Sequence, residues 1–371
     1  MDLSVSYPRS TLTAAFFGAM LGEEKAKVGA GCMAASLLQI QLEEPDSPAR
    51  LVGIAKLAAA GESIRQGHDV EYFTLPAKAL LNRCLSKRVP FDWTINPYRG
   101  CEFACKYCYA RYTHEFMQMR DGVDFERKIY VKQQTAWLLR QELKKVKRGE
   151  QIAIGTATDP YQPAERRFEI TRGILQELTL HHGLELGIVT KSDLVVRDID
   201  LLQEVARHNV LYINLTITTL NTKLARILEP RAPRPDLRLA AVSKLVGAGL
   251  NAGVICAPVL PGITDSPAAL DKLVRATKEA GGKYIYANPL FLKPCSANVF
   301  LPFLEKEFPH LVDDYRKRYA DRAFVSKAYS KRLSELMAAL RKKHGIKKEV
   351  EDRGTLSANY RAKDVQLALF G

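Results

Sequence analysis

Residues 96–111 read NPYRGCEFACKYCYAR and place Cys101, Cys105 and Cys108 in one short segment with C-x3-C-x2-C spacing. A closed zinc site needs four ligands, and a cubane iron–sulfur cluster in an electron carrier takes four thiolates. Three thiolates on one loop can instead hold three irons of a [4Fe–4S] cubane and leave the fourth iron open. An open metal position is what a catalytic site needs and a structural site lacks.

The same cysteines allow a second interpretation, in which His114 supplies a fourth ligand and the metal is zinc. The chain would then be a zinc-stabilised nucleic-acid-binding protein without catalysis. Such a protein would be colourless and would have no affinity for a nucleotide-derived cofactor. A third interpretation is that the spacing arose by chance and the cysteines bind no metal.

Short apolar runs alternate with helical patterns around and beyond the cysteines. The strands expected from these runs cover residues 93–96, 152–154, 184–190, 210–218, 253–259 and 283–290. Strands separated by helices indicate βαβ units and a parallel sheet. Six units are two short of a complete eight-fold barrel, so we expect an α/β fold with a partial (β/α)6 TIM-like barrel. The cysteines follow the first strand, where loops of such barrels carry the active site.

The expected barrel occupies residues 70–295, between an N-terminal extension and a C-terminal region. Residues 1–69 have Ala/Gly-rich stretches and no sustained period, and we expect them to be partly disordered. Residues 296–371 are expected to be helical to about His344, with a tail beyond it. Within the barrel, apolar residues at helical spacing predict a helix over residues 128–147. Ser266 with Pro267 after it predicts a helix start.

Bulk composition is that of a soluble globular protein, with 47% hydrophobic and 26% charged residues among 371. We find no apolar run long enough to span a membrane. Seven cysteines, three of them clustered, indicate metal binding in a reducing compartment, and the protein is expected to be cytoplasmic. The net charge of +14 is concentrated in residues 128–148 and 327–348, which either attract a polyanion such as DNA or RNA or form solvated helix faces.

The cysteine motif, with Tyr107 directly before its last cysteine, resembles the signature of the radical S-adenosylmethionine (SAM) superfamily. The wider pattern NPYRGC-x3-C-x2-CYAR, followed by Thr113-His114-Glu115, resembles the spore photoproduct lyase branch. It is most similar to a group of uncharacterised bacterial proteins related to that lyase. The resemblance extends from about residue 70 to about residue 345.

This resemblance implies a [4Fe–4S] cluster and SAM as cofactors, with a reductant such as flavodoxin or ferredoxin as electron donor. The cluster would cleave SAM reductively, and a 5′-deoxyadenosyl radical would abstract hydrogen from the substrate. A lyase-like reaction on nucleic acid is the activity that the branch suggests. A small molecule or a protein side chain is the alternative substrate, because the same barrel supports many reactions.

Residues for SAM are carried over from the resemblance by their positions at strand ends. Tyr107 matches the aromatic residue beside the adenine, and Thr156 or Thr158 can accept a hydrogen bond from the SAM ammonium. Lys191 can neutralise the SAM carboxylate, and Ser192 can bond to it or to the ribose. Further candidates are Thr216 and Thr218 near the ribose, and Arg231 for a phosphate or the carboxylate.

Tyr107 and Tyr109 match the pair of tyrosines that is implicated in radical relay in the lyase, and they are the catalytic residues that the resemblance implies. The lyase also relies on a hydrogen-donating cysteine about forty residues after the motif. No cysteine occurs here around residues 151–154. Cys256 and Cys295 are the remaining candidates in the barrel, and each also suits a structural role.

Overall fold

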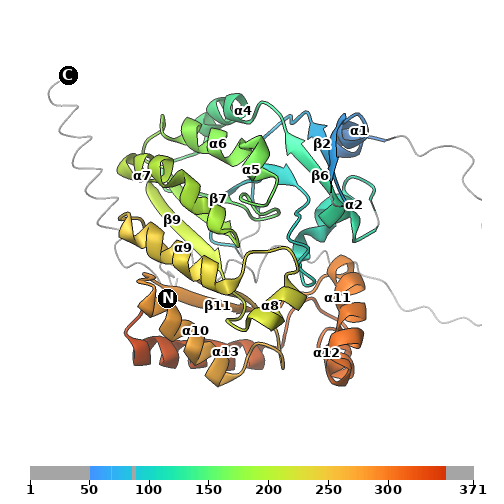
Figure 1. Ribbon diagram of the computed structural model, residues 1–371. Coiled ribbons are helices and arrows are strands. Elements are labelled where there is room, and N and C mark those ends of the chain that lie inside the picture. Colours follow the sequence, from blue (N-terminus) through green and yellow to red (C-terminus); the bar gives the residue numbers. More distant parts are fainter. Residues whose placement is uncertain (1–50, 68, 86–88, 120, 348–371) are drawn as a thin grey trace, which may run out of the picture.

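The structure, a computed structural model, describes residues 51–67, 69–85, 89–119 and 121–347. Within these residues the strands form a seven-stranded and a four-stranded sheet, with helices around them (Figure 1). The N-terminal fifty residues and residues 348–371, for which disorder and a tail were expected, lie outside the described part.

The larger sheet has the strand order β11-β10-β9-β8-β7-β4-β3. Every pair of adjacent strands from β11 to β4 in this order is parallel. Only β3 pairs in the antiparallel sense among the described strands of this sheet, at its edge. The bounds are β3 Leu81–Arg83, β4 Trp93–Ile95, β7 Gln151–Ile154, β8 Glu185–Thr190, β9 Val210–Thr216, β10 Ala252–Val259 and β11 Ile285–Pro289. The parallel strands correspond to the six expected from the sequence, and the open order confirms a partial (β/α)6 arrangement.

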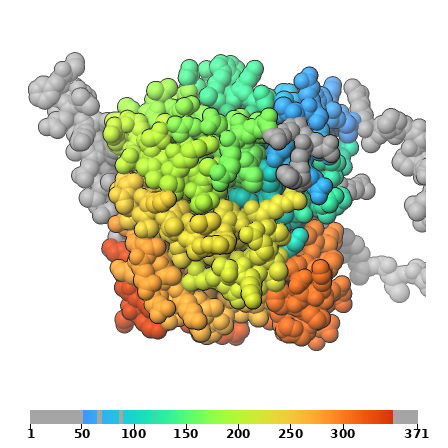
Figure 2. Space-filling view, viewed as in Figure 1, coloured from blue at the N-terminus to red at the C-terminus, as the bar shows by residue number. Residues whose placement is uncertain are grey.

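Helices lie in the connections between the parallel strands from β7 to β11. These are α5 Glu165–Phe168, α6 Ile170–Leu178, η3 Asp193–Asp198, α7 Ile199–His208, α8 Thr222–Leu228, α9 Pro235–Gly247 and α10 Pro267–Glu279. Of these, α6, α7, α9 and α10 pack on the outer face of this sheet. Helix α10 begins as expected, because the Ser266 hydroxyl accepts a hydrogen bond from the backbone N–H of Ala269 at 3.3 Å. In the space-filling view these helices form one closely packed surface (Figure 2).

Side chains alternate between the two faces of the parallel strands, as the period of a strand requires. On β7, Ile152 and Ile154 pack in the core beneath the helices, while Ala153 belongs to a separate inner cluster. On β10, Cys256 faces the helices and Ala257 faces inward. The inner face holds a separate cluster of alanine, branched aliphatic and aromatic side chains.

The smaller sheet, with order β1-β2-β6-β5, was not expected from the sequence. Its strands are β1 Ser63–Gly67, β2 Val70–Leu75, β5 Tyr98–Arg99 and β6 Lys128–Lys132, and α1 Gly53–Ala59 precedes them. Residues 51–67 of the extension, which was expected to be partly disordered, thus contain a helix and a strand. The single helix expected over 128–147 is also wrong: KIYVK forms β6, followed by α4 Thr135–Glu142 and η2 Leu143–Lys145. Branched and aromatic residues in KIYVK favour a strand, and pairing with β2 and β5 selects it.

The remaining helices lie near the cysteine loop or at the C-terminal end. They are η1 Tyr109–Arg111, α2 Tyr112–Glu115, α3 Asp124–Arg127, α11 Pro294–Glu307, η4 Pro309–Leu311, α12 Val312–Arg318 and α13 Lys327–His344. The C-terminal region is helical to His344, as expected. No helix in the described ranges is both long and apolar enough to cross a membrane.

The two basic segments do not form one surface. Helix α4, within the first segment, and α13, within the second, lie at opposite ends of the molecule (Figure 1). Several of their charges are also used internally: Arg140 pairs with Glu177 at 2.7 Å, and Lys343 pairs with Asp271 at 2.9 Å. The two basic segments are therefore separate features of the described structure.

Candidate active site

A cavity lies between the cysteine loop and the carboxyl ends of the parallel strands. The three cysteines of the motif line it, together with residues at or just beyond the carboxyl ends of β7, β8, β9, β10 and β11. Its lining includes Cys101, Cys105, Tyr107, Cys108, Tyr109, Gly155, Thr156, Ala157, Thr158, Asp159, Lys191, Thr216, Ala257, Pro258 and Phe291. The fold therefore brings together most of the residues selected from the sequence, although they come from distant segments.

Gly100 sets the path of the cysteine loop where the chain leaves β5. Its φ is +82°, a conformation that side chains disfavour, and a Cβ there would lie 2.6 Å from the Lys128 carbonyl oxygen. The Gly100 carbonyl accepts hydrogen bonds from Thr158 Oγ1 at 2.6 Å and from Gln162 Nε2 at 3.1 Å. The loop is thereby fastened to the segment after β7 immediately before the first cysteine.

Two further contacts fix the later cysteines through their backbone. Arg111, only 2% exposed, donates to the Cys105 carbonyl at 3.0 Å and forms an ion pair with Glu126 at 2.7 Å. Ser296, on α11, donates to the Cys108 carbonyl at 2.9 Å. Because these two bonds use carbonyl oxygens, they position the loop without occupying the sulfur atoms of Cys105 and Cys108.

The thiols themselves fit a cluster site. Burial raises the pKa of Cys101 and Cys108, and raises that of Cys105 to about 12, so a bound metal is what would keep them ionised. All three thiols line one cavity, and none of them forms a disulfide. A cubane spreads its cysteines, since each binds a different iron.

A mononuclear zinc site is not favoured by the geometry. Across the described ranges, no three His, Cys, Asp or Glu side chains are grouped so as to hold a metal ion together. His114, the candidate fourth ligand, packs edge-on against Phe125 and Tyr130 and its Nε2 lies 3.1 Å from the Lys128 carbonyl. Burial lowers the pKa of His114 to about 4. The imidazole is a neutral packing group beside the loop.

Asp159 joins the two loops that carry the expected SAM contacts. Its carboxylate accepts from Thr190 Oγ1 at 2.6 Å, the Lys191 backbone N–H at 2.7 Å and the Tyr161 backbone N–H at 3.0 Å. Burial raises the pKa of Asp159, while these hydrogen bonds act in the opposite direction. The loop after β7 and the end of β8 are therefore held in one fixed arrangement.

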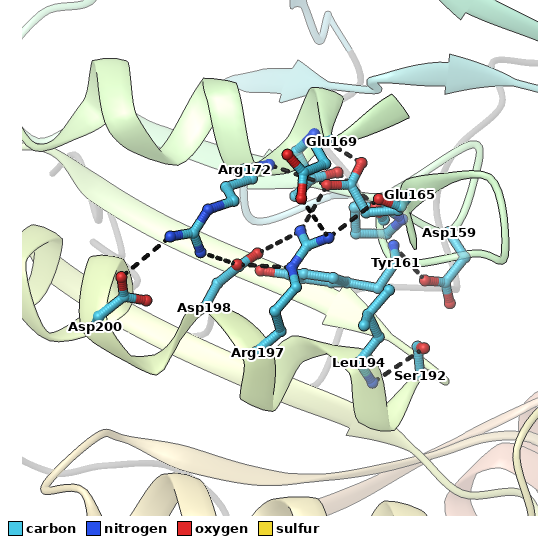
Figure 3. A network of polar contacts seen from close by, with 12 residues as sticks. Asp159, Tyr161, Glu165, Glu169, Arg172, Ser192, Leu194, Arg197, Asp198 and Asp200 are labelled. Atoms are coloured by element: carbon cyan, nitrogen blue, oxygen red, sulfur yellow. Dashed lines mark hydrogen bonds and ion pairs between the residues drawn. The ribbon is translucent and has the colours of Figure 1, made fainter. Parts of the chain in front are cut away.

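A network of charged residues supports these loops from behind (Figure 3). Glu165, which is fully buried, accepts from Tyr98 at 2.5 Å and pairs with Arg197 at 2.9 Å. Arg197 also pairs with Asp198 at 2.8 Å, and Arg172 bridges Asp198 and Asp200 at 2.5 and 3.2 Å. Because buried charges are retained only when paired, this network fixes α5, α6 and η3 relative to the cavity.

Tyr107 is anchored by a polar group that sequence reasoning missed. Its hydroxyl donates to Glu229 and lies 3.0 Å from Thr218 Oγ1, which itself donates to Glu229 at 2.7 Å. Glu229 forms a buried ion pair with Arg238. Burial alone would raise the pKa of Glu229, but the charges of Arg238 and Lys191 outweigh burial and lower the pKa. The carboxylate is therefore ionised. The local sequence does not indicate that Glu229 and Arg238 support Tyr107, because nine residues separate the pair and Tyr107 is 122 residues from Glu229.

Tyr109 and Lys191 complete the lining near the cysteines. The buried Tyr109 donates its hydroxyl proton to the Thr156 carbonyl and lies 6.2 Å from the Phe291 ring. Lys191 Nζ lies 5.7 Å from the centre of the Tyr107 ring. Burial lowers the pKa of Lys191, but the charges of Cys105 and Glu229 outweigh it and raise the pKa. The cavity thus carries one ammonium group beside its thiols.

Some residues selected from the sequence lie outside the cavity lining. The Ser192 hydroxyl caps η3 by accepting from the Leu194 N–H at 3.2 Å, and Thr218 lies behind Tyr107. Cys256 packs under the helices because of the alternation on β10, and half-buried Cys295 begins α11. Arg231 is exposed on the surface. The cysteines that line the cavity within the described chain are therefore those of the motif.

Comparisons with known proteins agree with this geometry. The family model of the radical SAM superfamily matches residues 95–274. The uncharacterized protein Mb2609c of Mycobacterium bovis is 35% identical over 283 residues, which cover 76% of this chain and 83% of that protein. The uncharacterized protein MJ0683 of Methanocaldococcus jannaschii is 27% identical over 257 residues, covering 69% of this chain and 91% of that protein.

Among solved structures, spore photoproduct lyase complexed with dinucleoside spore photoproduct has a TM-score of 0.56 at 16% identity. The match covers 74% of this chain and 79% of the lyase chain. A mutant of the lyase with bound AdoMet and the same dinucleoside has a TM-score of 0.55. At this identity the likeness establishes a common fold. Together with the family match and the cysteine loop at the strand ends, it shows that the chain belongs to the radical SAM superfamily.

Proposed function

We propose that this chain is a radical SAM enzyme that holds a [4Fe–4S] cluster on Cys101, Cys105 and Cys108. The observation that carries the proposal is the single cavity shared by these thiols and by the strand-end residues from Thr156 to Lys191. Cluster and SAM bound there would supply reductive cleavage of SAM to a 5′-deoxyadenosyl radical that abstracts hydrogen from substrate. The protein's part is to orient both cofactors and to exclude water.

The chain's own side chains have distinct parts in this proposal. Lys191 would neutralise the SAM carboxylate, since it is the ammonium group that lines the cavity in the described residues. Thr156 and Thr158 would accept from the SAM ammonium, and Tyr107 would pack beside the adenine. Ser192 and Thr218, which lie outside the cavity lining, would support the SAM site indirectly, Ser192 by capping η3 and Thr218 by holding Glu229 behind Tyr107.

Tyr107 and Tyr109 are proposed as the residues that relay hydrogen to and from the substrate. Both are buried and flank the last cysteine, and their hydroxyl protons are held by Glu229 and by the Thr156 carbonyl. Burial and, for Tyr107, the Glu229 charge raise the pKa of both phenols well above 10, so both remain protonated. A protonated phenol is the form that can donate a hydrogen atom.

The substrate we propose is nucleic acid, acted on in a lyase-like reaction. Support comes from the fold shared with spore photoproduct lyase, whose solved complex contains a dinucleoside lesion. Binding of DNA and RNA should weaken steeply as salt is raised if phosphates are neutralised by the chain. Absence of binding at low salt would favour a small molecule or a protein side chain as substrate.

Electron paramagnetic resonance of the anaerobically reconstituted, reduced protein tests the cofactor proposal. A [4Fe–4S]+ signal that changes shape on adding SAM is expected, and serine variants of Cys101, Cys105 or Cys108 should lose it. Cys84→Ser is the matched control, because Cys84 is half-buried and does not line the cavity. Tightly bound zinc with no cluster signal would overturn the proposal. If the cluster forms, flavodoxin or ferredoxin should support SAM cleavage in place of a chemical reductant such as dithionite.

A further inference from the structure

A second cavity adjoins the first and contains positive charge that no part of the proposed chemistry uses. It lies between the β3–β4 edge of the larger sheet and β5 and β6 of the smaller sheet. Thr156 and Ala157 line both cavities, so they form a common wall. The residues that give the second cavity its chemistry are Asn82, Asn96, Arg99, Tyr112, Phe116 and Lys132.

Arg99 and Lys132 place two positive charges in this cavity from neighbouring strands. Arg99 on β5 pairs with Tyr130 on β6, and Lys132 follows Tyr130 by two residues on the same face of the sheet. Lys132 is only 5% exposed. Among the described residues, neither cation has a carboxylate within ion-pair distance, and the buried Nε of Arg99 has no hydrogen-bond partner.

Two unneutralised cations in a largely buried place are unfavourable unless a ligand compensates them. The Arg99 guanidinium makes one long hydrogen bond, from Nη1 to the Thr113 carbonyl at 3.4 Å. The nearest acidic influence on Lys132 is Glu142, whose carboxylate is already bound to the backbone N–H groups of Leu80 and Leu81 at 2.9 and 2.8 Å. An oxyanion in the cavity would supply the missing charge.

Burial also lowers the pKa of Lys132 to about 7, and the charge of Arg99 acts in the same direction, with Glu142 opposing them. Burial is the main cause of this shift, and the like charge of Arg99 adds to it. A dianionic ligand would reverse it by favouring the charged ammonium.

Aromatic side chains lie at the mouth of the same cavity. Phe116 is 60% exposed, and its ring packs edge-on against Tyr112 with 5.6 Å between the ring centres. An exposed ring beside a cationic cavity suits a planar base next to a phosphate, since bases stack on aromatic side chains. Amide groups of Asn82 and Asn96 add hydrogen-bonding capacity along the wall.

We infer that this cavity binds the phosphate group of a nucleotide, either free or within a strand, through Arg99 and Lys132, with the base against Phe116 and Tyr112. The inference deepens the proposed function and rests on it for the identity of the substrate. Because Thr156 and Ala157 separate the two cavities, a nucleotide anchored here lies one layer of residues from the proposed site of hydrogen abstraction. The cavity thus positions substrate, whereas Lys191 serves SAM.

Calorimetric titration of the cluster-loaded protein with 2′-deoxynucleoside 5′-monophosphates and with the matching nucleosides tests this assignment. The monophosphates should bind at least about tenfold more tightly than the nucleosides, as charge-assisted hydrogen bonds to phosphate require. Lys132→Met and Arg99→Gln should remove most of this difference. Inorganic phosphate should compete with the monophosphates in the parent protein.

Lys128→Met is the matched control, because Lys128 lies on the same strand but is paired with Asp124 at 3.0 Å outside the cavity. It should bind monophosphates like the parent protein. Equal affinity for nucleosides and monophosphates, or unchanged affinity in Lys132→Met, would overturn the assignment. SAM cleavage measured on the same samples distinguishes the two proposals. Cleavage of SAM with equal binding of nucleosides and monophosphates contradicts only the phosphate site. Tighter binding of monophosphates without SAM cleavage contradicts only the proposed enzyme class.

Discussion

Glu229 and Arg238 form a buried ion pair directly behind Tyr107, with side chains that are 2% and 1% exposed. Arg238 also donates to the carbonyls of Thr216 at 2.9 Å and Pro233 at 2.8 Å. Glu229 in turn holds the hydroxyls of Tyr107 and Thr218. One ion pair therefore connects α9, the end of β9 and the cysteine loop.

Removing one member of this pair should cost far more stability than removing both. Glu229→Leu leaves the Arg238 charge buried without a partner, and loss of about 3 to 5 kcal/mol of unfolding free energy is expected. The double variant Glu229→Leu with Arg238→Met leaves no unpaired charge and should recover part of that loss. Urea unfolding of the single and double variants measures both values. Additive losses in the double variant would show that the two charges are not coupled.

Gly100 is predicted to be the glycine of the cysteine loop that tolerates no side chain. Gly100→Ala combines a φ of +82° with a Cβ only 2.6 Å from the Lys128 carbonyl oxygen and 2.9 Å from that of Phe125. The loop must shift, so both the unfolding midpoint and the iron bound per chain after reconstitution should fall.

Gly149→Ala separates the two causes, because Gly149 has nearly the same φ of +81° and nothing within 4 Å of the added Cβ. It should cost about 1 to 2 kcal/mol through backbone strain alone and leave iron content unchanged. If both variants lost the same stability and kept full iron, the close contact at Gly100 would have no part in forming the loop.

The repeated strand–helix pattern was sufficient to predict the parallel sheet, because six apolar runs match the six parallel strands of the described fold. The smaller sheet escaped prediction because β2 and β5 pair with β6 across long stretches of sequence, and β5 has only two residues. Local periodicity carries no information on such partners.

The sequence predicts the site residues that lie in one short motif or at strand ends. It does not predict those that the fold brings together from distant segments. The spacing of Cys101, Cys105 and Cys108 is a local signal, and strand ends selected Thr156 and Lys191, which line the cavity with the cysteines. The parts taken by Glu229 and Lys132 depend on which elements pack together. By sequence, Lys132 is one charge of the basic segment 128–148, whereas pairing of β5 with β6 buries it beside Arg99.

His114 is predicted to make the protein more sensitive to acid. Burial lowers its pKa from 6.5 to about 4, so between these pH values the unfolded state binds a proton that the folded state does not. Stability should therefore fall as pH drops from 6.5 to 4, by about 3 kcal/mol at the lower limit. His114→Gln, which keeps a donor for the Lys128 carbonyl, should lack this component. Unfolding free energies of both proteins at several pH values give the difference, and parallel curves would contradict the prediction.

Lys191 is predicted to determine SAM affinity without affecting the cluster. Lys191 lines the cavity, and its ammonium nitrogen lies 5.7 Å from the centre of the Tyr107 ring. This cation–aromatic contact is its link to the cysteine loop. Lys191→Met should therefore weaken SAM binding by about tenfold or more, because a carboxylate in the cavity would lose its charged partner. Lys191→Arg should retain part of the affinity, since it keeps the charge but changes the geometry.

Equilibrium binding of SAM to the reconstituted variants, with iron content measured on the same samples, distinguishes this effect from loss of the cluster. Lys293→Met is the matched control: Lys293 lies 3.9 Å from the centre of the Tyr112 ring, a similar cation–aromatic contact outside the cavity lining. It should bind SAM like the parent protein. Normal SAM affinity in Lys191→Met would assign the carboxylate to another group, whereas a parallel loss of iron would make Lys191 a support for the cysteine loop rather than a cofactor ligand.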